Sequence, residues 1–433
     1  MKKRLLITAA IMTMGIFTAN AQEQSTASAI SSLQAENEKN AKAIADLQKD
    51  AAKSWTRNIK MSGYVQMQWQ MSQIKGGDAK YNGGNFGKNT DNRFLLRRGR
   101  LKLAYSSKYL GGAIQLDASS SGVSLAEAAV DFHLPSQVFA LSTGLIYLPF
   151  SYYLDYSSSA RMNPEIPRAV RALMPNDTGL GAHATFRGPK GTGWNGLMFN
   201  IGAYSQNGSK ADLDGRKMIL SRLQYNAKYE KFGWGVMGSI EYGGVKNLVN
   251  ESFKYDKSAK AFVATTGVEG KYNNSLYYDL GAKLHFTTVL GKTNLMGEFI
   301  WGNQPGSQKS NASVKAAADW GAEDAVYNRK FNSYYVNFDH EFPKTNLSLL
   351  VRYDCYDPNS QVKGNEIGQY AGTGAADIAF STLGTGLCYS TLKGALRVIA
   401  YYEFVWNEKT ANLAGFDKNI KDNLFTLRVQ AKF

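Results

Sequence analysis

The feature that most constrains this chain is an alternation of apolar and polar residues, repeated in windows of about ten residues from residue 59 to the end. In the first window, Met61, Val65, Met67, Trp69 and Met71 alternate with lysine, serine, tyrosine and glutamine. Successive side chains of a β-strand point to opposite faces, and about ten tilted residues cross the hydrocarbon layer of a membrane. The pattern therefore predicts strands with one face towards lipid and the other towards water.

Sixteen segments of this kind can be counted. We expect them near residues 59–72, 93–106, 110–120, 124–134, 138–149, 179–187, 196–206, 217–231, 233–243, 274–288, 292–302, 328–341, 344–356, 379–390, 394–406 and 422–433. Short turns alternate with long loops near residues 74–92, 150–178, 244–273, 303–327, 357–378 and 407–421. Because outer-membrane barrels have short turns at one end and long loops at the other, we predict an all-β fold. It is a sixteen-stranded antiparallel transmembrane β-barrel over residues 59–433.

The N-terminus predicts export. Lys2, Lys3 and Arg4 precede an apolar run that ends at the small-residue site 19–21, so residues 1–21 have the pattern of a secretory signal peptide. Their apolar run is too short to span a bilayer as a helix. Export together with a barrel pattern indicates the bacterial outer membrane, with both termini in the periplasm.

The segment over residues 22–55 predicts a short periplasmic helix. Ile30, Leu33, Ile44 and Leu47 fall on a heptad, and asparagines occupy the core positions between them. This spacing is typical of a coiled coil. An amphipathic linker helix is the alternative, because about three heptads are marginal alone.

The chain ends on an amphipathic strand with an aromatic terminus. Phe425, Leu427, Val429, Ala431 and Phe433 share one face. Outer-membrane barrels typically close with such a strand, so we expect Phe433 to be the signal that the barrel-assembly machinery reads. Membrane lipid and that machinery are therefore expected partners.

The net charge indicates which class of solute the barrel would favour. The formal charge is +15, and leaving out the signal peptide and residues 22–53 places +13 of it on the barrel. A basic balance favours nucleic acid, an anionic membrane face or anionic solutes. Export makes nucleic acid the least expected, so we expect small anions as partners.

A row of cations is predicted to line the interior. In residues 94–105, Leu101 and Leu103 share one face while Arg98, Arg100 and Lys102 share the other. Lipid cannot accept the second face, because Arg or Lys at mid-membrane costs about 2–4 kcal/mol. The same parity points further cations inward, namely Arg222, Lys228, Lys283, Arg352, Arg397 and Arg428. Such residues attract anions, unless acidic residues offset them to leave an ordinary hydrated lumen; the candidates are Glu127, Asp131, Asp279 and Glu403.

The long loop at about 150–178 is a candidate constriction. It contains Arg161, Arg168 and Arg171 together with three prolines. A stiffened loop of this length can fold into the lumen, where its arginines would dominate the field. The alternative is that it caps the outside.

Enzymatic chemistry is not indicated. The four histidines show no metal-ligand spacing, and no glycine-rich motif opens a helix. We therefore expect a protein that is not an enzyme and has no cofactor and no metal. Cys355 and Cys388 should lie near opposite ends of adjacent strands, which is too far apart for a disulfide.

Four stretches of the chain resemble the phosphate-selective porins of the O and P type, in the form found in Bacteroidetes-like bacteria. They are Leu96-Arg97-Arg98-Gly99-Arg100-Leu101, Gly144-Leu145-Ile146-Tyr147-Leu148-Pro149-Phe150, Arg352-Tyr353-Asp354-Cys355-Tyr356-Asp357-Pro358-Asn359 and the terminal strand. Ser151 stands where the family often has glycine. The resemblance covers residues from about 59 to the end and implies a sixteen-stranded homotrimer that passes phosphate or related anions without energy coupling.

Three function classes follow. The first is a passive channel for small anions, with phosphate or polyphosphate preferred. The second is a general or sugar-preferring porin, with Tyr64, Tyr147, Tyr152 and Tyr153 as an aromatic track. The third is an outer-membrane enzyme or adhesin on a barrel scaffold. A transporter of twenty-two strands with a plug does not fit in 433 residues.

Overall fold

The computed structural model describes residues 32–46, 55–210, 215–313, 321 and 324–433. The predicted signal peptide, and the predicted helical segment apart from residues 32–46 and 55, lie outside the described residues. The chain divides into two compact units, Met1–Ile59 and Lys60–Phe433. In the first unit, residues 32–46 form a helix on which Leu33 and Ile44 are exposed. None of the described helices is long and apolar enough to cross a membrane.

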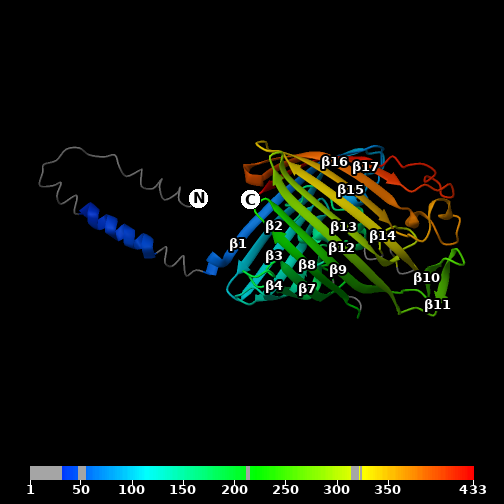
Figure 1. Ribbon diagram of the computed structural model, residues 1–433, viewed down its shortest axis with the longest axis horizontal. Helices are drawn as coiled ribbons and strands as arrows, with labels where there is room; N and C mark the ends of the chain where they lie inside the picture. The colour runs from blue at the N-terminus through cyan, green and yellow to red at the C-terminus, as the bar shows by residue number, and fades with distance from the viewer. Residues whose placement is uncertain (1–31, 47–54, 211–214, 314–320, 322–323) are drawn as a thin grey trace. The chain divides into compact units, whose positions relative to one another are not determined.

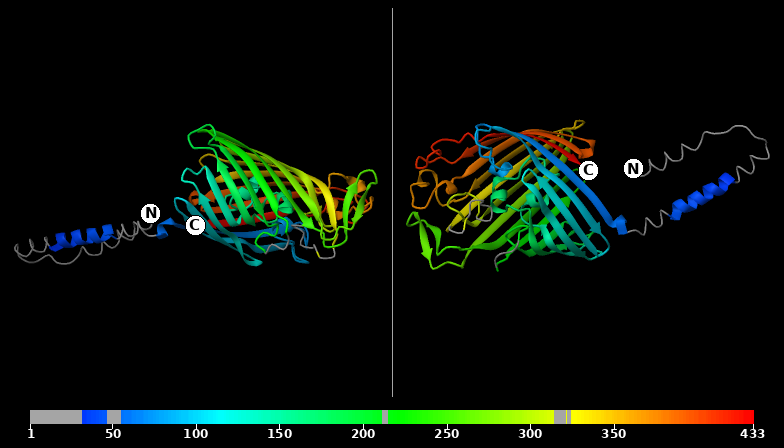
Figure 2. Two further views of the ribbon diagram at one scale, coloured as in Figure 1. Left: turned by 90° about the horizontal axis from the view of Figure 1, so that it is seen from below. Right: turned by 180° about the vertical axis from the view of Figure 1, so that it is seen from behind.

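The second unit is a closed antiparallel barrel (Figure 1). Its strands are β1 (Ile59–Ser72), β2 (Asn92–Ser106), β3 (Leu110–Ser119), β4 (Gly122–His133), β5 (Phe139–Tyr147), β6 (Thr178–Arg187), β7 (Leu197–Tyr204), β8 (Met218–Lys228), β9 (Phe232–Lys246), β12 (Tyr272–Thr288), β13 (Gly291–Gly306), β14 (Val326–Glu341), β15 (Leu347–Asp357), β16 (Phe380–Thr391), β17 (Leu396–Asn407) and β18 (Leu424–Lys432). Neighbours in this order pair, and β18 pairs with β1 to close the ring. In the view from behind, β18 in red lies beside β1 in blue (Figure 2). The prediction of sixteen antiparallel strands is confirmed.

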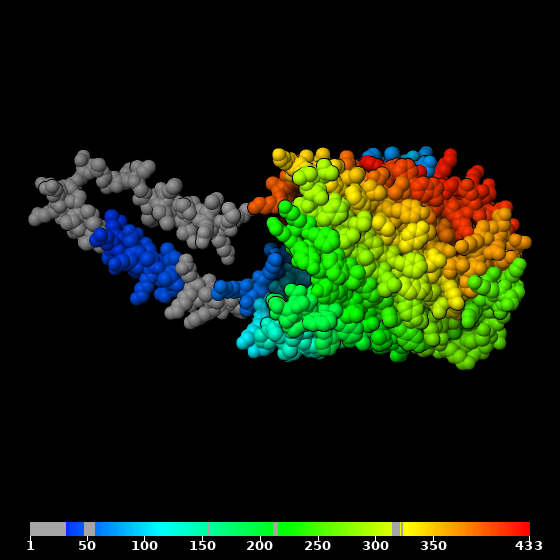
Figure 3. Space-filling model, in the orientation of Figure 1, coloured from blue at the N-terminus to red at the C-terminus, as the bar shows by residue number. Residues whose placement is uncertain are grey.

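The two-residue rhythm of the first strand is also confirmed. Met61, Val65, Met67 and Met71 are exposed, whereas the glutamines between them are buried. The same outward exposure of apolar residues recurs on the other strands, and Figure 3 shows the outer wall from β8 to β17 as one continuous surface. An apolar outer face suits a lipid environment.

The predicted loop at 244–273 contains a hairpin that the sequence analysis missed. Strands β10 (Glu251–Asp256) and β11 (Ala261–Thr266) pair with each other, and β10 also pairs in parallel with the start of β14. The hairpin lies at the end of the barrel opposite the C-terminus (Figure 1). Tyr255 and Phe262 pack there with Val362 and Ile367 of another long loop. Strands of six residues are too short to give the alternation over about ten residues that predicts a membrane-spanning strand.

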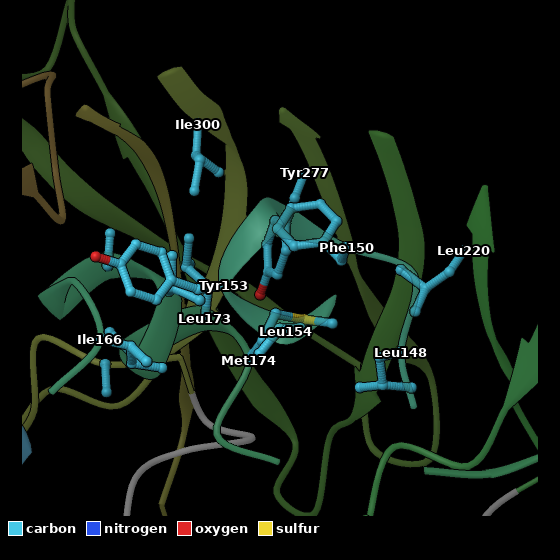
Figure 4. Packing of buried hydrophobic residues seen from close by; sticks show 14 of the residues in the cluster. Leu148, Phe150, Tyr153, Leu154, Ile166, Leu173, Met174, Leu220, Tyr277 and Ile300 are labelled. Atoms are coloured by element: carbon cyan, nitrogen blue, oxygen red, sulfur yellow. The ribbon is translucent and has the colours of Figure 1, made fainter. Parts of the chain in front are cut away.

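The interior is not polar all the way round, and here the expectation of water-facing residues on every strand is wrong. Six short connecting helices in the described part of the chain were also not assigned from the sequence; two of them, α3 (Ser151–Asp155) and α4 (Arg168–Leu173), lie in the loop after β5. Phe150, Leu154 and Leu173 of this loop pack against inward-facing Tyr277 and Ile300 (Figure 4). These strand residues can be apolar because the loop, rather than water, covers them.

The remaining connecting helices of the second unit are 3-10 turns. They are η2 (Lys80–Asn82), η3 (Gly364–Glu366), η4 (Ala375–Asp377) and η5 (Leu392–Gly394). A further turn, η1 (Trp55–Asn58), ends the first unit just before β1. Cys355 and Cys388 are free and lie opposite Ser381 and Ser348 on β15 and β16. The prediction that they do not form a disulfide is confirmed.

Candidate functional site

The loop between β5 and β6 runs across the inside of the barrel. Near its start, Ser151 bonds to side chains of β12 and β13. Further along, the Asn163 amide donates to Asn337 of β14 at 2.9 Å, and the Ser158 hydroxyl lies 2.5 Å from that of Tyr64 on β1. Because these contacts reach opposite parts of the ring, the loop divides the interior.

Two carboxylates of the wall hold the first turn of this loop. The Ser151 hydroxyl donates to Glu298 at 2.7 Å, and its backbone N–H donates to Asp279 at 3.2 Å. The N–H of Tyr152 also donates to Glu298. Ser151 has a φ of 58°, a left-handed conformation that favours glycine. The hydrogen bonds to the carboxylates therefore offset a strained backbone.

Seven cations gather where the loop approaches β2 and β18, and we call them the cation cluster. Its members are Arg97, Arg98, Arg100, Lys102, Arg161, Arg171 and Arg428. The sequence analysis predicted that Arg98 and Arg100 point inward, and both are buried inside the barrel. Arg97 points inward as well, since it reaches a loop carboxylate.

Two consecutive inward residues break the alternation of β2. The regular pairing of β2 with β3 begins at Gly99, and the N–H of Ser120 donates to the carbonyl of Leu96. Arg97 and Arg98 therefore occupy a bulge, the feature that lets neighbouring residues share a face. The sequence carried the signal: alternation alone would turn one of two adjacent arginines towards lipid.

Glu165 of the loop binds two cluster members. Both of its carboxylate oxygens accept from Arg97 at 2.8 Å, and one of them also accepts from Arg428 at 2.8 Å. Burial alone would raise the pKa of Glu165, but Arg97 and Arg428 outweigh it and hold the pKa well below its usual range. The carboxylate is therefore charged at neutral pH. The amide of Gln68, oriented with its oxygen towards Arg428, accepts from that guanidinium at 2.6 and 3.1 Å.

Asp177, where the loop ends, binds a second group. Its oxygens lie 3.3 Å from Arg171, 3.7 Å from Arg161 and 4.0 Å from Arg100. Burial would raise the pKa of Asp177, but Arg171 and Arg161 lower it to well below its usual range. Asp177 is thus an ionised counter-charge that holds two loop arginines beside β2.

Two further ion pairs lie along the wall. Arg100 binds Asp117 of β3 at 2.8 Å, and Lys102 binds Glu127 of β4 at 2.5 Å. The alternative of offsetting acids is therefore correct in part, since Glu127 neutralises Lys102. Even so, six of the seven cations share only four carboxylates, which leaves the cluster with an excess of three positive charges.

Arg98 differs from the other members. Arg98 is 8% exposed, and its guanidinium makes no hydrogen bond or ion pair with any residue in the described part of the chain. It lines a cavity of about 240 Å³ with Arg97, Arg100 and Arg171. Hydroxyls also face this cavity, from Ser119, Ser124, Thr178 and Ser209. A site with a spare guanidinium and several hydroxyls suits a small oxyanion.

A second cavity of about 250 Å³ adjoins the first. Arg100 and Tyr147 line both cavities, and Lys102 and Tyr64 line only the second. The second cavity also meets Ser62 and Lys432, which lie at the short-turn end of the barrel. The two cavities together follow one side of the lumen from the loop towards the short turns.

The structure does not bring every predicted residue into the cluster. Arg168 lies between the rings of Tyr81 and Phe380, 5.1 and 4.5 Å from their centroids. Arg352 is bound by Asp354 and Glu403, both at 3.1 Å. Arg352 is therefore a cation of the wall that is bound by carboxyl groups on both sides.

The other predicted cations lie elsewhere on the inner wall. Arg222 is buried, Lys283 lies 5.0 Å from the ring of Tyr152, and Arg397 donates to the carbonyl of Ser159 at 3.0 Å. Lys228, Lys283 and Arg397 line a third cavity of about 480 Å³. Arg161 of the cation cluster lines the same third cavity, so these cations adjoin the cluster there.

The predicted aromatic track is divided. Tyr64 and Tyr147 line the second cavity, but Tyr152 and Tyr153 belong to the loop itself and are buried, with the Tyr153 hydroxyl donating to Asn337 of β14. A continuous line of the four tyrosines is therefore not formed. Within the described ranges, no group of three or more His, Cys, Asp and Glu side chains could hold a metal ion.

The residues that sequence reasoning missed are Arg97, Glu165 and Asp177. The adjacent arginines were a usable signal for the first. The two acids lie in a loop, where no periodicity indicates what a side chain will contact. Only the folded path of the loop brings them to the cations.

No family model matches the sequence, and the comparison with curated proteins finds no match. Solved structures do match. OprB of Pseudomonas putida gives a TM-score of 0.59 at 10% identity, over 90% of this chain and 97% of that one. OmpF of Salmonella typhi, solved with daunomycin, gives 0.54 at 13% over 87% and 97%. An anion-selective porin from Comamonas acidovorans gives 0.51 at 12% over 87% and 99%.

The fold and the interior loop define the class of this protein as a porin-like β-barrel. With identities of 10 to 13%, these likenesses establish the fold. What passes through such a barrel must be argued from its own residues.

Proposed function

We propose that this chain is an outer-membrane channel for the passive diffusion of small anions. The observation that carries the proposal is the cation cluster, whose excess of positive charge lies beside two adjoining cavities on one side of the lumen. A narrow polar space with low-dielectric walls focuses such a field and raises the local concentration of anions.

The position of the loop supports an eccentric route. The apolar cluster fills the part of the interior lined by Tyr277, Ile300 and Phe331, where contact with apolar side chains would cost a charged solute its hydration. The two cavities lie instead against β1 to β5. We propose that the loop is the constriction, with Arg161 and Arg171 at its narrow point.

Phosphate is the anion that the family resemblance favours. Guanidinium groups bind phosphate oxygens in pairs of parallel hydrogen bonds, and Arg98 has donors to spare. The Arg97-Arg98 pair that carries the resemblance contributes to the cavity itself. We therefore propose that the channel prefers phosphate among small anions.

The remaining partners follow from the ends of the chain. The Phe433 backbone pairs with Gly63 at the β1–β18 seam through hydrogen bonds of 2.9 and 3.0 Å, which supports the proposal that the assembly machinery reads this aromatic residue. Exposed Leu33 and Ile44 on the helix of residues 32–46 favour self-association, so we propose a homotrimer. We also propose that both termini lie in the periplasm.

Substitution of Arg98 tests the function of the site. We expect Arg98→Gln to weaken inhibition of chloride current by phosphate about tenfold, because a charge-assisted hydrogen bond contributes roughly 1.5–3 kcal/mol. The measurement is single-channel recording with phosphate titration. Lys257→Gln, an exposed residue in the β10–β11 turn, is the matched control.

Two results would count against the proposal. Unchanged phosphate inhibition in Arg98→Gln would remove this residue from the anion site. Equal weakening in Lys257→Gln would show that net charge alone, and not the cavity, governs inhibition.

A further inference from the structure

Glu165 occupies an oxyanion site that is already built. Arg97 donates to both carboxylate oxygens of Glu165, and Arg428 donates to one of them, each at 2.8 Å. Guanidinium groups bind a free carboxylate or phosphate in the same way. The Glu165 side chain is 4% exposed. The loop thus supplies its own anion to a pair of arginines that a solute could otherwise use.

The site that Glu165 occupies adjoins the guanidinium group of Arg98. Arg97 and Arg98 line the same cavity of about 240 Å³. Arg97 is taken by Glu165, while Arg100 and Arg171 are taken by Asp117 and Asp177. Among the described residues, this leaves the cavity with one arginine, Arg98, that has no ion-pair partner.

We propose that Glu165 is a specificity-determining residue that limits the channel to solutes carrying a single oxyanion group. The inference rests on the proposed anion channel and names the solute class of the same site. One oxyanion binds Arg98, and the hydroxyls of Ser119, Ser124 and Thr178 contact the uncharged remainder of the solute. Phosphate monoanion and small sugar acids belong to this class, whereas pyrophosphate lacks a second cationic site.

A solute does not readily displace Glu165. The carboxylate is tethered to the same chain, so its effective concentration beside the arginines exceeds that of a free anion. The loop is also held next to Glu165 by Arg352, whose guanidinium donates to the Glu165 carbonyl at 2.5 Å. Removing the charge of the side chain, rather than moving the loop, is therefore the way to free the second site.

The experiment compares Glu165→Gln with the wild type in single-channel recordings. Pyrophosphate and glucuronate are the two probes, and each is titrated for inhibition of chloride current. In the wild type we expect their inhibition constants to agree within about threefold, since each engages one guanidinium. In Glu165→Gln we expect pyrophosphate to inhibit at least tenfold more strongly, with a change of less than about threefold for glucuronate.

Glu341→Gln is the matched control, because Glu341 is an acid at the short-turn end whose partner is exposed Lys292 at 3.7 Å. It should leave both inhibition constants unchanged. Faster migration of unheated samples in gels shows that each variant has folded. Glu165→Asp keeps the charge and should keep the two inhibition constants within about threefold of each other, as in the wild type.

Several outcomes would overturn the inference. If the wild-type channel already prefers pyrophosphate about tenfold, the inference is wrong, and this result does not depend on whether Glu165→Gln folds. Equal strengthening for both probes in Glu165→Gln would reduce the effect to net charge. These results differ from failure of the proposed function, which would appear as a cation-selective wild type.

Discussion

The hydroxyl of Ser151 is expected to hold the interior loop in place, and two substitutions separate its roles. Ser151→Ala removes the hydrogen bond to Glu298 but keeps a side chain at a φ of 58°. Ser151→Gly removes the same bond and also relieves the backbone. The loop should therefore be destabilised more by alanine than by glycine, although glycine is the smaller residue.

The magnitudes follow from the contacts. Leaving the buried Glu298 oxygen without its donor costs roughly 1–3 kcal/mol, which is the full loss expected in Ser151→Ala. A left-handed conformation costs a non-glycine residue about 1–2 kcal/mol, which Ser151→Gly regains. The greater freedom of glycine in the open loop takes back roughly 0.5–1 kcal/mol. The net loss for Ser151→Gly is then about 1–2 kcal/mol.

Hydrogen exchange of the peptide over residues 151–177 measures this opening directly, because exchange rates report the free energy of local unfolding. Protection should fall about tenfold to a hundredfold in Ser151→Ala and several-fold in Ser151→Gly. Ser157→Ala is the control, since its exposed hydroxyl lies 3.0 Å from that of Ser159 and far less depends on it than on a buried carboxyl contact. Equal loss in the two Ser151 variants, or greater loss with glycine, would refute the balance of strain and hydrogen bonding.

Further predictions concern pH, thiols and the buried contacts at each end of the barrel. The pKa of Glu165 is lower in the folded protein than in the unfolded chain, so its stabilising effect is complete above the unfolded value of about 4.3 and is lost only as pH falls through the lower folded value. Reversal potentials should therefore show the same anion preference at pH 7 and close to pH 4, and a switch to cation preference there would contradict the ion pairs. Dithiothreitol should leave the gel mobility of the folded protein unchanged, because both cysteines are free; a shift would indicate a disulfide. Asp377→Asn leaves buried Arg329 without its 2.8 Å ion pair, and thermal unfolding should show a loss of about 3–5 kcal/mol, against no loss if the long loops are unimportant for stability. Phe433→Ala should lower the fraction of heat-modifiable, folded protein, and an unchanged fraction would deny the terminal aromatic an assembly role.

The sequence was sufficient to predict the barrel because strand alternation is a local property. The exposed methionines of β1 and the buried glutamines between them follow directly from the printed order of residues. Arg98 and Arg100 could be assigned to the interior for the same reason, because their exposure to lipid would cost free energy. Their role in anion passage stays a prediction.

What the sequence did not predict depends on contacts between distant residues. Tyr277 and Ile300 face inward although they are apolar, because a loop more than a hundred residues away covers them. Glu165 meets Arg97 across 68 residues and Arg428 across 263. Neither contact has a local signature, so the division of the lumen and the neutralisation of its cations required the folded loop.

The central claim is that the excess charge of the cation cluster selects anions. The most direct test is the reversal potential of the purified wild-type protein in a planar bilayer under a potassium chloride gradient. The account predicts a potential of the sign set by chloride, reduced in Arg98→Gln. A potential of the sign set by potassium would contradict it.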